Sequence, residues 1–308
     1  MKLRIATRGS RLAIWQAEHV AALLSQSAAV ETELVRVTSS GDRDQTRPVA
    51  ELQSQGLFTK EIQQAVLDGR ADLAVHSLKD LPTEETPGLV LAAVPERESV
   101  VDVLVSRNGR GWAQLPRGAR IGTGSRRRRA QLLNVRPDFV MLELRGNVET
   151  RLQKLRDGEY DAIVLAQAGL RRLGLDDPLM HEKLNPTFFQ PAVGQGALGI
   201  EARADDISTL QILERLDHAA SRATVTAERA MLAALRGGCL APIGAWARIE
   251  SDGLLKLEAV VLSLDGRKKL AAIASDSPDQ AIALGQRVAA DLDRQGAAKL
   301  IAASRNAN

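Results

Sequence analysis

The sequence has few aromatic residues, a single cysteine and no long apolar run. Only 3% of its 308 residues are aromatic although 44% are hydrophobic, so leucine, valine, isoleucine and alanine must fill the cores. Scarce aromatics also disfavour the stacking surfaces that bind single-stranded nucleic acid. Cys239 cannot form an internal disulfide, and the four histidines lack metal-ligand spacing. We therefore expect a reduced compartment and no metal site.

Targeting and membrane signals are missing as well. Residues 1–7 lead directly into a strand-like pattern, without the apolar core of a signal peptide. No stretch approaches the ~20 apolar residues that span a bilayer. We expect a soluble, cytoplasmic protein that does not bind a membrane. The formal net charge is only +3, so local clusters of charge matter more than the total.

Short β-rich segments alternate with helical patterns along much of the chain. This alternation predicts an α/β fold with βαβ units and largely parallel sheets. The predicted strands are 34–37, 72–76, 100–105, 140–144 and 162–165, and the predicted helices are 10–26, 58–67, 148–156, 220–235 and 279–295.

A weak internal repeat divides the chain. Residues 5–11 resemble residues 121–127, and residues 68–75 resemble residues 157–164 in the same order. Chance similarity between common strand-turn-helix phrases is the alternative explanation. We infer two similar α/β domains that face one another. From about residue 220 the pattern changes to a smaller α+β domain, with Cys239 on the loop after an alanine-rich helix.

Basic residues collect where predicted strands meet helices. Free N–H groups at a helix start favour an anion, and arginine binds carboxylates with a planar fork. Capping by Ser10 and Ser125, with solvated arginines beyond, would explain each junction singly. The number of such junctions instead favours a ligand with several carboxylates, at the strand ends where α/β domains bind ligands. The arginines concerned are Arg8, Arg11, Arg126, Arg127, Arg128, Arg129, Arg145, Arg151, Arg171 and Arg172.

The basic run 126–129 also permits a nucleic-acid hypothesis, because such runs can neutralise phosphates. The run lies in a structured turn-helix context, aromatic partners are scarce, and acidic residues are abundant elsewhere. We therefore expect no nucleic-acid partner.

Two further positions carry possible chemistry. Asp80 follows the predicted strand 72–76 on a loop with Ser77 and Lys79, where a carboxylate could stabilise a cation or transfer protons. A capping or turn aspartate remains the alternative. Cys239 follows two glycines, which favours an accessible thiol suited to covalent attachment. A buried structural cysteine and a cysteine hydrolase are the alternatives.

These segments resemble the porphobilinogen deaminase (hydroxymethylbilane synthase) family over nearly the whole chain. The matching phrases lie at 6–13, 56–61, 76–82, 122–125, 144–148, 191–201 and 237–239. The resemblance implies three domains, the first two similar to type II periplasmic binding proteins with doubly wound mixed sheets. It implies domain 1 at 1–96 plus 197–217, domain 2 at 97–196 and a small α+β domain 3 at 218–308. The two crossovers would form a hinge.

The resemblance also implies a function and a site. A transferase of this family deaminates four porphobilinogen molecules, joins them head to tail on a dipyrromethane primer and releases hydroxymethylbilane, in tetrapyrrole and heme biosynthesis. Cys239 would hold the dipyrromethane through a thioether, Asp80 would be catalytic, and a monomer is expected. Implied cofactor contacts are Ser10, Ser77, Lys79, Thr123, Ser125, Arg127, Arg128 and Arg145; implied substrate contacts are Arg8, Arg145, Arg151, Arg172 and Phe58.

Some positions depart from the family pattern. Gln53, Ser54 and Gln55 replace the usual glycine and lysine, which puts a lysine role in that loop in doubt. Arg126 stands where an apolar residue is usual, and we assign neither Arg126 nor Arg129 a catalytic role. Phe58 could equally be a core residue. The main rival function is a noncatalytic small-anion binding protein, which would need neither Cys239 nor Asp80.

Overall fold

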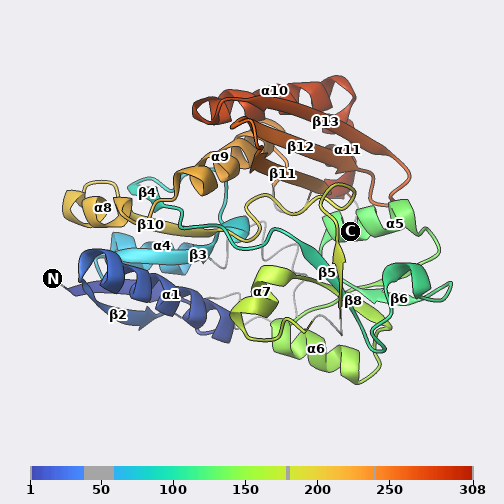
Figure 1. Ribbon diagram of the computed structural model, residues 1–308, viewed down its shortest axis with the longest axis horizontal. Coiled ribbons are helices and arrows are strands. Elements are labelled where there is room, and N and C mark those ends of the chain that lie inside the picture. The colour runs from blue at the N-terminus through green and yellow to red at the C-terminus, as the bar shows by residue number, and fades with distance from the viewer. Residues whose placement is uncertain (1, 38–58, 178–180, 239–240, 307–308) are drawn as a thin grey trace.

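The computed structural model describes residues 2–37, 59–177, 181–238 and 241–306. Its described strands form two five-stranded sheets and one three-stranded sheet (Figure 1). We call these sheets, with the helices that flank them, the first, second and third units. The first unit contains β1 (Lys2–Thr7), α1 (Arg11–Ala28), β2 (Glu31–Arg36), α4 (Lys60–Leu67), β3 (Leu73–Ser77), the 3-10 turn η1 (Leu78–Asp80), β4 (Leu89–Ala93), β10 (Leu198–Arg203) and α8 (Ile207–Glu214).

The second unit is inserted between β4 and β10, and the third unit follows α8. The second contains β5 (Asp102–Ser106), η2 (Trp112–Gln114), β6 (Arg120–Gly122), α5 (Arg126–Val135), β7 (Val140–Leu142), α6 (Val148–Arg156), β8 (Ala162–Ala166), α7 (Gln167–Arg172) and β9 (His181–Leu184). The third contains α9 (Ala219–Ala234), β11 (Ile243–Ile249), β12 (Leu255–Leu262), β13 (Lys269–Asp276), η3 (Pro278–Gln280), α10 (Ala281–Arg294) and α11 (Ala297–Asn306).

The two larger sheets have equivalent strand orders, β2-β1-β3-β10-β4 and β7-β6-β8-β5-β9. In each sheet the first three strands are parallel, whereas β10 runs against β3 and β4, and β5 runs against β8 and β9. Only one of the five strands in each sheet is reversed, so the expectations of largely parallel strands and of mixed α/β sheets are both confirmed. The reversed strands, β5 and β10, are the ones that directly follow the two crossovers between the units.

The internal repeat corresponds to repeated structure. The repeated Asp-Gly phrases end α4 and α6, with Gly69 at φ +70° and Gly158 at φ +80°. Directly before the strands that follow, the Asp72 side chain accepts a hydrogen bond from the backbone N–H of Arg4, and the Asp161 side chain accepts one from the N–H of Arg120, both at 2.8 Å. Chance similarity is thus excluded, because the same phrases fix the same turn and strand pairing twice.

Helices α1 and α5, which follow the repeated turns, each begin with a serine side-chain cap. The Ser10 hydroxyl accepts the Ala13 N–H at 3.3 Å, and the Ser125 hydroxyl accepts the Arg128 N–H at 3.4 Å. These bonds satisfy donors that a helix start leaves free, so both serines have the capping role that their position predicts.

The third unit is a three-stranded antiparallel sheet with α9 and α10 packed against it (Figure 1). Alternate residues of β12, such as Leu255 and Leu257, are fully buried and pack in one cluster with Met231 and Leu284 of the helices. Gly285 permits the close approach of α10 to α9, because a Cβ there would lie 2.4 Å from the Ala227 carbonyl oxygen.

The two crossovers between the first and second units lie against one another. The Glu98 N–H donates to the Gly196 carbonyl at 3.3 Å. Gly196 has φ +87°, and a Cβ there would lie 2.2 Å from the Glu98 carbonyl oxygen, so only glycine fits. Hinge motion at this contact stays a prediction.

No described helix combines the length and apolar character needed to cross a membrane.

Candidate active site

Apolar packing on its buried side holds the loop that carries Lys79 and Asp80. It continues β3 as η1, and the Leu78 N–H donates to the Ala197 carbonyl at 3.0 Å. Leu78 and Leu81 are buried in one cluster with Val225 of α9. Because these two leucines point into the core, Lys79 and Asp80 between them remain half-buried.

This loop faces the second unit. Burial lowers the pKa of Lys79 to about 8; the carboxylates of Asp80 and Asp102 oppose this shift, and Arg128 and Arg127 add to it. On α6, burial lowers the pKa of Arg151 to about 10, and the Asp80 carboxylate again opposes the shift. The predicted catalytic carboxylate therefore lies within electrostatic reach of cations from both units.

Three of the predicted basic residues, Lys79, Arg151 and Arg172, are half-buried cations. Arg151 donates from Nε to the Gly146 carbonyl at 2.7 Å, and Arg172 donates from Nη2 to the Gly196 carbonyl at 2.6 Å. Burial lowers the pKa of Arg172 to about 10, as it does for Arg151. Among the described residues, no carboxylate lies within 4.0 Å of the charged nitrogens of Lys79, Arg151 or Arg172. Buried positive charge without a paired carboxylate fits a ligand that brings its own.

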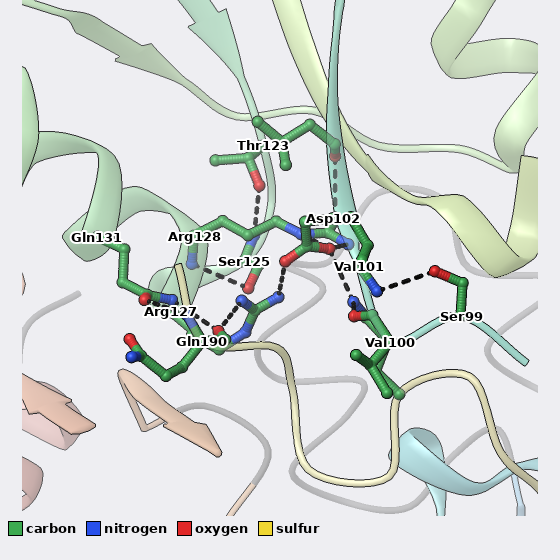
Figure 2. A network of polar contacts seen from close by, with 12 residues as sticks. Ser99, Val100, Val101, Asp102, Thr123, Ser125, Arg127, Arg128, Gln131 and Gln190 are labelled. Atoms are coloured by element: carbon green, nitrogen blue, oxygen red, sulfur yellow. Dashed lines mark hydrogen bonds and ion pairs between the residues drawn. The ribbon is translucent and has the colours of Figure 1, made fainter. Parts of the chain in front are cut away.

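Arg127 and Arg128 differ, because both pair with Asp102 (Figure 2). Arg127 Nη2 lies 2.7 Å from Asp102 Oδ2, and Arg128 Nη2 lies 2.6 Å from Oδ1. The Asp102 side chain is fully buried. Burial alone would raise its pKa, but the two arginines outweigh that effect and hold the pKa of Asp102 well below its usual range.

The same network extends to the segment that leads from β9 back to β10, which we call the return crossover. Arg127 Nη1 donates to the Gln190 carbonyl at 2.6 Å (Figure 2). Gln195 Nε2 donates to Asp102 Oδ1 at 3.0 Å. Asp102 therefore orders both arginines and a crossover residue. We did not single out Asp102 from the sequence, although an acidic residue inside the apolar run 100–105 indicates a buried charge that needs a partner.

The other predicted contacts lie around the same strand ends. Ser77 accepts a hydrogen bond from Gln16 Nε2 at 2.7 Å, and Thr123 Oγ1 accepts the Ser125 N–H at 3.2 Å. Arg8 is half-buried just beyond β1. Arg145 Nε lies 3.7 Å from Glu143 Oε1. Roles for these residues toward a cofactor or substrate stay predictions.

Two predicted residues, Phe58 and Cys239, lie outside the described residues. The described chain reaches Gly238 and resumes at Ala241. Arg126 donates to the Ser304 carbonyl of α11, so its guanidinium joins the second unit to the third. That contact accords with our assigning Arg126 no catalytic role.

Of two cavities in the part of the chain that the structure describes, one is lined by a predicted site residue. A cavity of about 280 Å³ lies between α1 and α7, and Trp15 and Arg172 are among the residues that line it. A larger cavity of about 760 Å³, beside Leu155 and His181, contains none of the predicted site residues. Within the described ranges, no three histidine, cysteine or acidic side chains are placed to hold a metal ion.

Two equivalent mixed α/β units, joined by paired crossovers, define a two-domain α/β architecture. Among solved structures, the methionine binding protein MetQ has a TM-score of 0.44 and 12% identity, covering 70% of this chain and 89% of that chain.

Comparisons of sequence identify the family. The family model described as "Porphobilinogen deaminase, dipyromethane cofactor binding domain" matches residues 3–211, and "Porphobilinogen deaminase, C-terminal domain" matches residues 222–294. The porphobilinogen deaminase of Nitratidesulfovibrio vulgaris (Miyazaki F) is 47% identical over 98% of this chain and 96% of its own. That of Chromobacterium violaceum is 48% identical over 98% and 97%. The chain belongs to the porphobilinogen deaminase family, whose members are transferases of tetrapyrrole biosynthesis.

Proposed function

We propose that this protein deaminates four porphobilinogen molecules and joins them head to tail on a covalently bound dipyrromethane primer. Hydrolysis then releases hydroxymethylbilane. Beyond family membership, one observation carries the proposal: Lys79, Arg151 and Arg172 are half-buried cations with no paired carboxylate among the described residues, and Asp80 acts electrostatically on the first two. A polycarboxylate substrate would supply the missing negative charge.

The residues present fit a dipyrromethane, since its acetate and propionate arms are carboxylates. Cys239 attaches it through a thioether, while Ser10, Ser77, Lys79, Thr123, Ser125, Arg127, Arg128 and Arg145 hold it. When bound, the dipyrromethane supplies the free pyrrole carbon at which the chain is extended. Gly237 and Gly238, which has φ +62°, support the attachment, because they let the backbone turn directly before the cysteine.

Four arginines bind the substrate, one of which, Arg145, also contacts the dipyrromethane. Each porphobilinogen carries one acetate and one propionate, so every added ring brings two carboxylates. Arg8, Arg145, Arg151 and Arg172 pair with these groups, and Phe58 contacts the ring. Arginine suits the task because its fork donates two parallel hydrogen bonds to one carboxylate.

Asp80 is the catalytic residue. When ammonia leaves the aminomethyl arm of porphobilinogen, positive charge spreads over the substrate pyrrole. The Asp80 carboxylate stabilises that charge, and half-buried surroundings strengthen the attraction relative to water. The Asp80 carboxylate lies within electrostatic reach of Lys79 and Arg151.

The proposal extends to the whole chain. We place domain 1 at 1–96 plus 197–217, domain 2 at 97–196 and domain 3 at 218–308. The passage of the chain from the first sheet to the second and back into β10 supports these bounds. We further propose a cytoplasmic monomer that binds neither nucleic acid nor membranes; the burial of Arg127 and Arg128 supports the lack of a nucleic-acid surface at this run.

Intact-mass analysis together with turnover tests the proposal. We expect purified protein to be heavier than its sequence by one dipyrromethane, with the added mass on the Cys239 peptide and absent from Cys239→Ala. Incubation with porphobilinogen should release ammonia and lengthen the bound chain. Reversible, stoichiometric binding without ammonia release would instead establish the small-anion binding protein.

A further inference from the structure

Helix α9 of the third unit contacts the end of the Asp80 loop through one arginine. Arg229 donates from Nη1 to the Leu81 carbonyl at 3.1 Å and from Nη2 to the Pro82 carbonyl at 2.7 Å. These are the two peptide groups directly after η1. A planar fork that bridges consecutive carbonyls restrains the backbone more tightly than a single bond does.

A second contact on the same face of α9 supports the first. Val225 lies one turn before Arg229 and is buried with Leu78 and Leu81, which bracket Lys79 and Asp80 in the sequence. On its other side, Leu78 is bonded to the Ala197 carbonyl of the return crossover. The loop is therefore held between the return crossover on one side and helix α9 of the third unit on the other.

Helix α9 is itself firmly anchored. The buried carboxylate of Glu228 accepts two hydrogen bonds from Arg97, one from the Gly194 N–H at 2.7 Å and one from the Ala247 N–H at 2.9 Å. Beyond Ala234 the chain turns at Arg236, which has φ +49°, and reaches Gly238 directly before Cys239. One rigid helix thus connects the Asp80 loop to the segment that leads to the cysteine.

We propose that Arg229 is a positioning residue, which fixes the Lys79–Asp80 loop relative to the helix that leads to Cys239. The inference rests on the proposed function, because it matters only if Asp80 and Cys239 serve one reaction. Arg229 would act through the backbone of Leu81 and Pro82, whose carbonyls accept its hydrogen bonds. Displacement of a catalytic group by about 1 Å can cost on the order of 10²-fold in rate.

Arg229→Met tests this role, because methionine keeps an apolar stem and removes every donor. Arg222→Met is the matched control on the same helix. Arg222 also donates to two consecutive carbonyls, Leu91 at 3.0 Å and Ala92 at 2.9 Å, and pairs with Asp217, but its targets lie on and beside β4. The control therefore also loses two backbone hydrogen bonds and an ion pair, without touching the Asp80 loop.

With each variant verified as holoprotein by intact mass, we expect Arg229→Met to lower kcat about 10- to 100-fold with KM within twofold of wild type. Arg222→Met should lose at least as much thermal stability and keep kcat within twofold. Arg229→Lys, which retains the charge, should recover part of kcat. Equal kcat losses in Arg229→Met and Arg222→Met, or unchanged kcat in both Arg229 variants, would overturn the role. Wild-type holoprotein that releases no ammonia from porphobilinogen would refute the proposed function itself.

Discussion

At the scale of single residues, charge balance separates two groups of basic side chains. Arg127 and Arg128 share the buried carboxylate of Asp102, so their charge is partly neutralised within the protein. Lys79, Arg151 and Arg172 have lowered pKa values and no paired carboxylate among the described residues. The second group has more to gain from a ligand carboxylate, because binding would offset its desolvation.

Asp80→Asn should leave the fold intact and lower kcat by about 10²-fold or more, since the amide keeps the shape but removes the charge that stabilises a cationic substrate. Steady-state kinetics of holoprotein measure the effect. Asp161→Asn is the control, because Asp161 is a half-buried carboxylate that pairs with Arg120. The pair lies where β6 and β8 begin, at the opposite end of these strands from the candidate site. Near-normal kcat in Asp80→Asn would defeat the assignment.

Lys79 predicts a pH dependence of substrate binding. Its pKa is lowered from 10.5 to about 8, so the ammonium is charged below that pH and becomes neutral above it. We expect KM for porphobilinogen to rise as pH increases from 7 to 9.5. Lys79 holds the dipyrromethane in our proposal, but its positive charge also adds to the field that attracts the carboxylates of the substrate. Arg at this position does not titrate in that range, so Lys79→Arg should remove this component of the rise. Identical KM profiles for the two proteins would exclude the effect.

The lowered pKa of Lys79 also makes the stability of the fold depend on pH. Between about pH 8 and 10.5 the unfolded chain holds a proton at Lys79 that the folded protein has released. This group therefore makes the free energy of unfolding increase with pH across that interval.

At the scale of elements, the paired crossovers are the feature that sequence periodicity does not reveal. Glu98 and Gly196 are far apart in the chain yet share a hydrogen bond, and Arg171 at the end of α7 pairs with Glu98 at 2.7 Å. A side chain at position 196 would force the crossovers apart. Their separation would also disturb Ala197, whose carbonyl accepts the Leu78 N–H at the start of the Asp80 loop.

Gly196→Ala should therefore destabilise the protein more than Gly174→Ala does. Both glycines have positive φ, which costs an alanine about 1–2 kcal/mol. Only position 196 adds a clash with the Glu98 carbonyl, since nothing lies within 4 Å of a Cβ at 174. We expect an additional ~1–3 kcal/mol for Gly196→Ala in urea unfolding. Equal losses in both variants would show that the crossovers can separate without cost.

At the scale of the whole molecule, the third unit is fastened to both of the others. Glu228 binds Arg97 and the Gly194 N–H near the crossovers. On the second unit, Asn134 of α5 donates to the Gly266 carbonyl at 2.7 Å. Figure 1 shows this unit lying across the other two. The segment that leads to the cysteine is thereby held over both sheets.

Glu228→Gln should weaken this attachment, because it leaves the Arg97 guanidinium buried without a carboxylate. Breaking such a buried pair costs about 3–5 kcal/mol. We expect calorimetry to show a lower midpoint, with separate unfolding of the third unit. Glu258→Gln is the control, since Glu258 pairs with Arg248 and Lys256 inside the third unit. A single transition at the wild-type midpoint in Glu228→Gln would contradict this attachment.

Much of the architecture was predictable because it is encoded locally. The repeated phrases at 5–11 and 121–127 predicted two equivalent units, and the prediction for 148–156 matches α6 at both ends. Ser10 and Ser125 showed as caps because capping depends on residues three positions away. The candidate site residues were predicted only through the ordered family phrases, since spacing alone does not distinguish a ligand-binding arginine from a solvated one.

The sequence by itself determined the composition of the cores, the repeat, the helix starts and the family, all of which depend on residue identity and short-range order. Tertiary structure alone decided which charges are paired. Asp102 neutralises Arg127 and Arg128, and Arg229 reaches the carbonyls after Asp80 from another unit. It also decided that β5 and β10 run against their neighbours. The physical reason is that the energy of a buried charge or a strand pairing depends on distant partners, which only folding brings together.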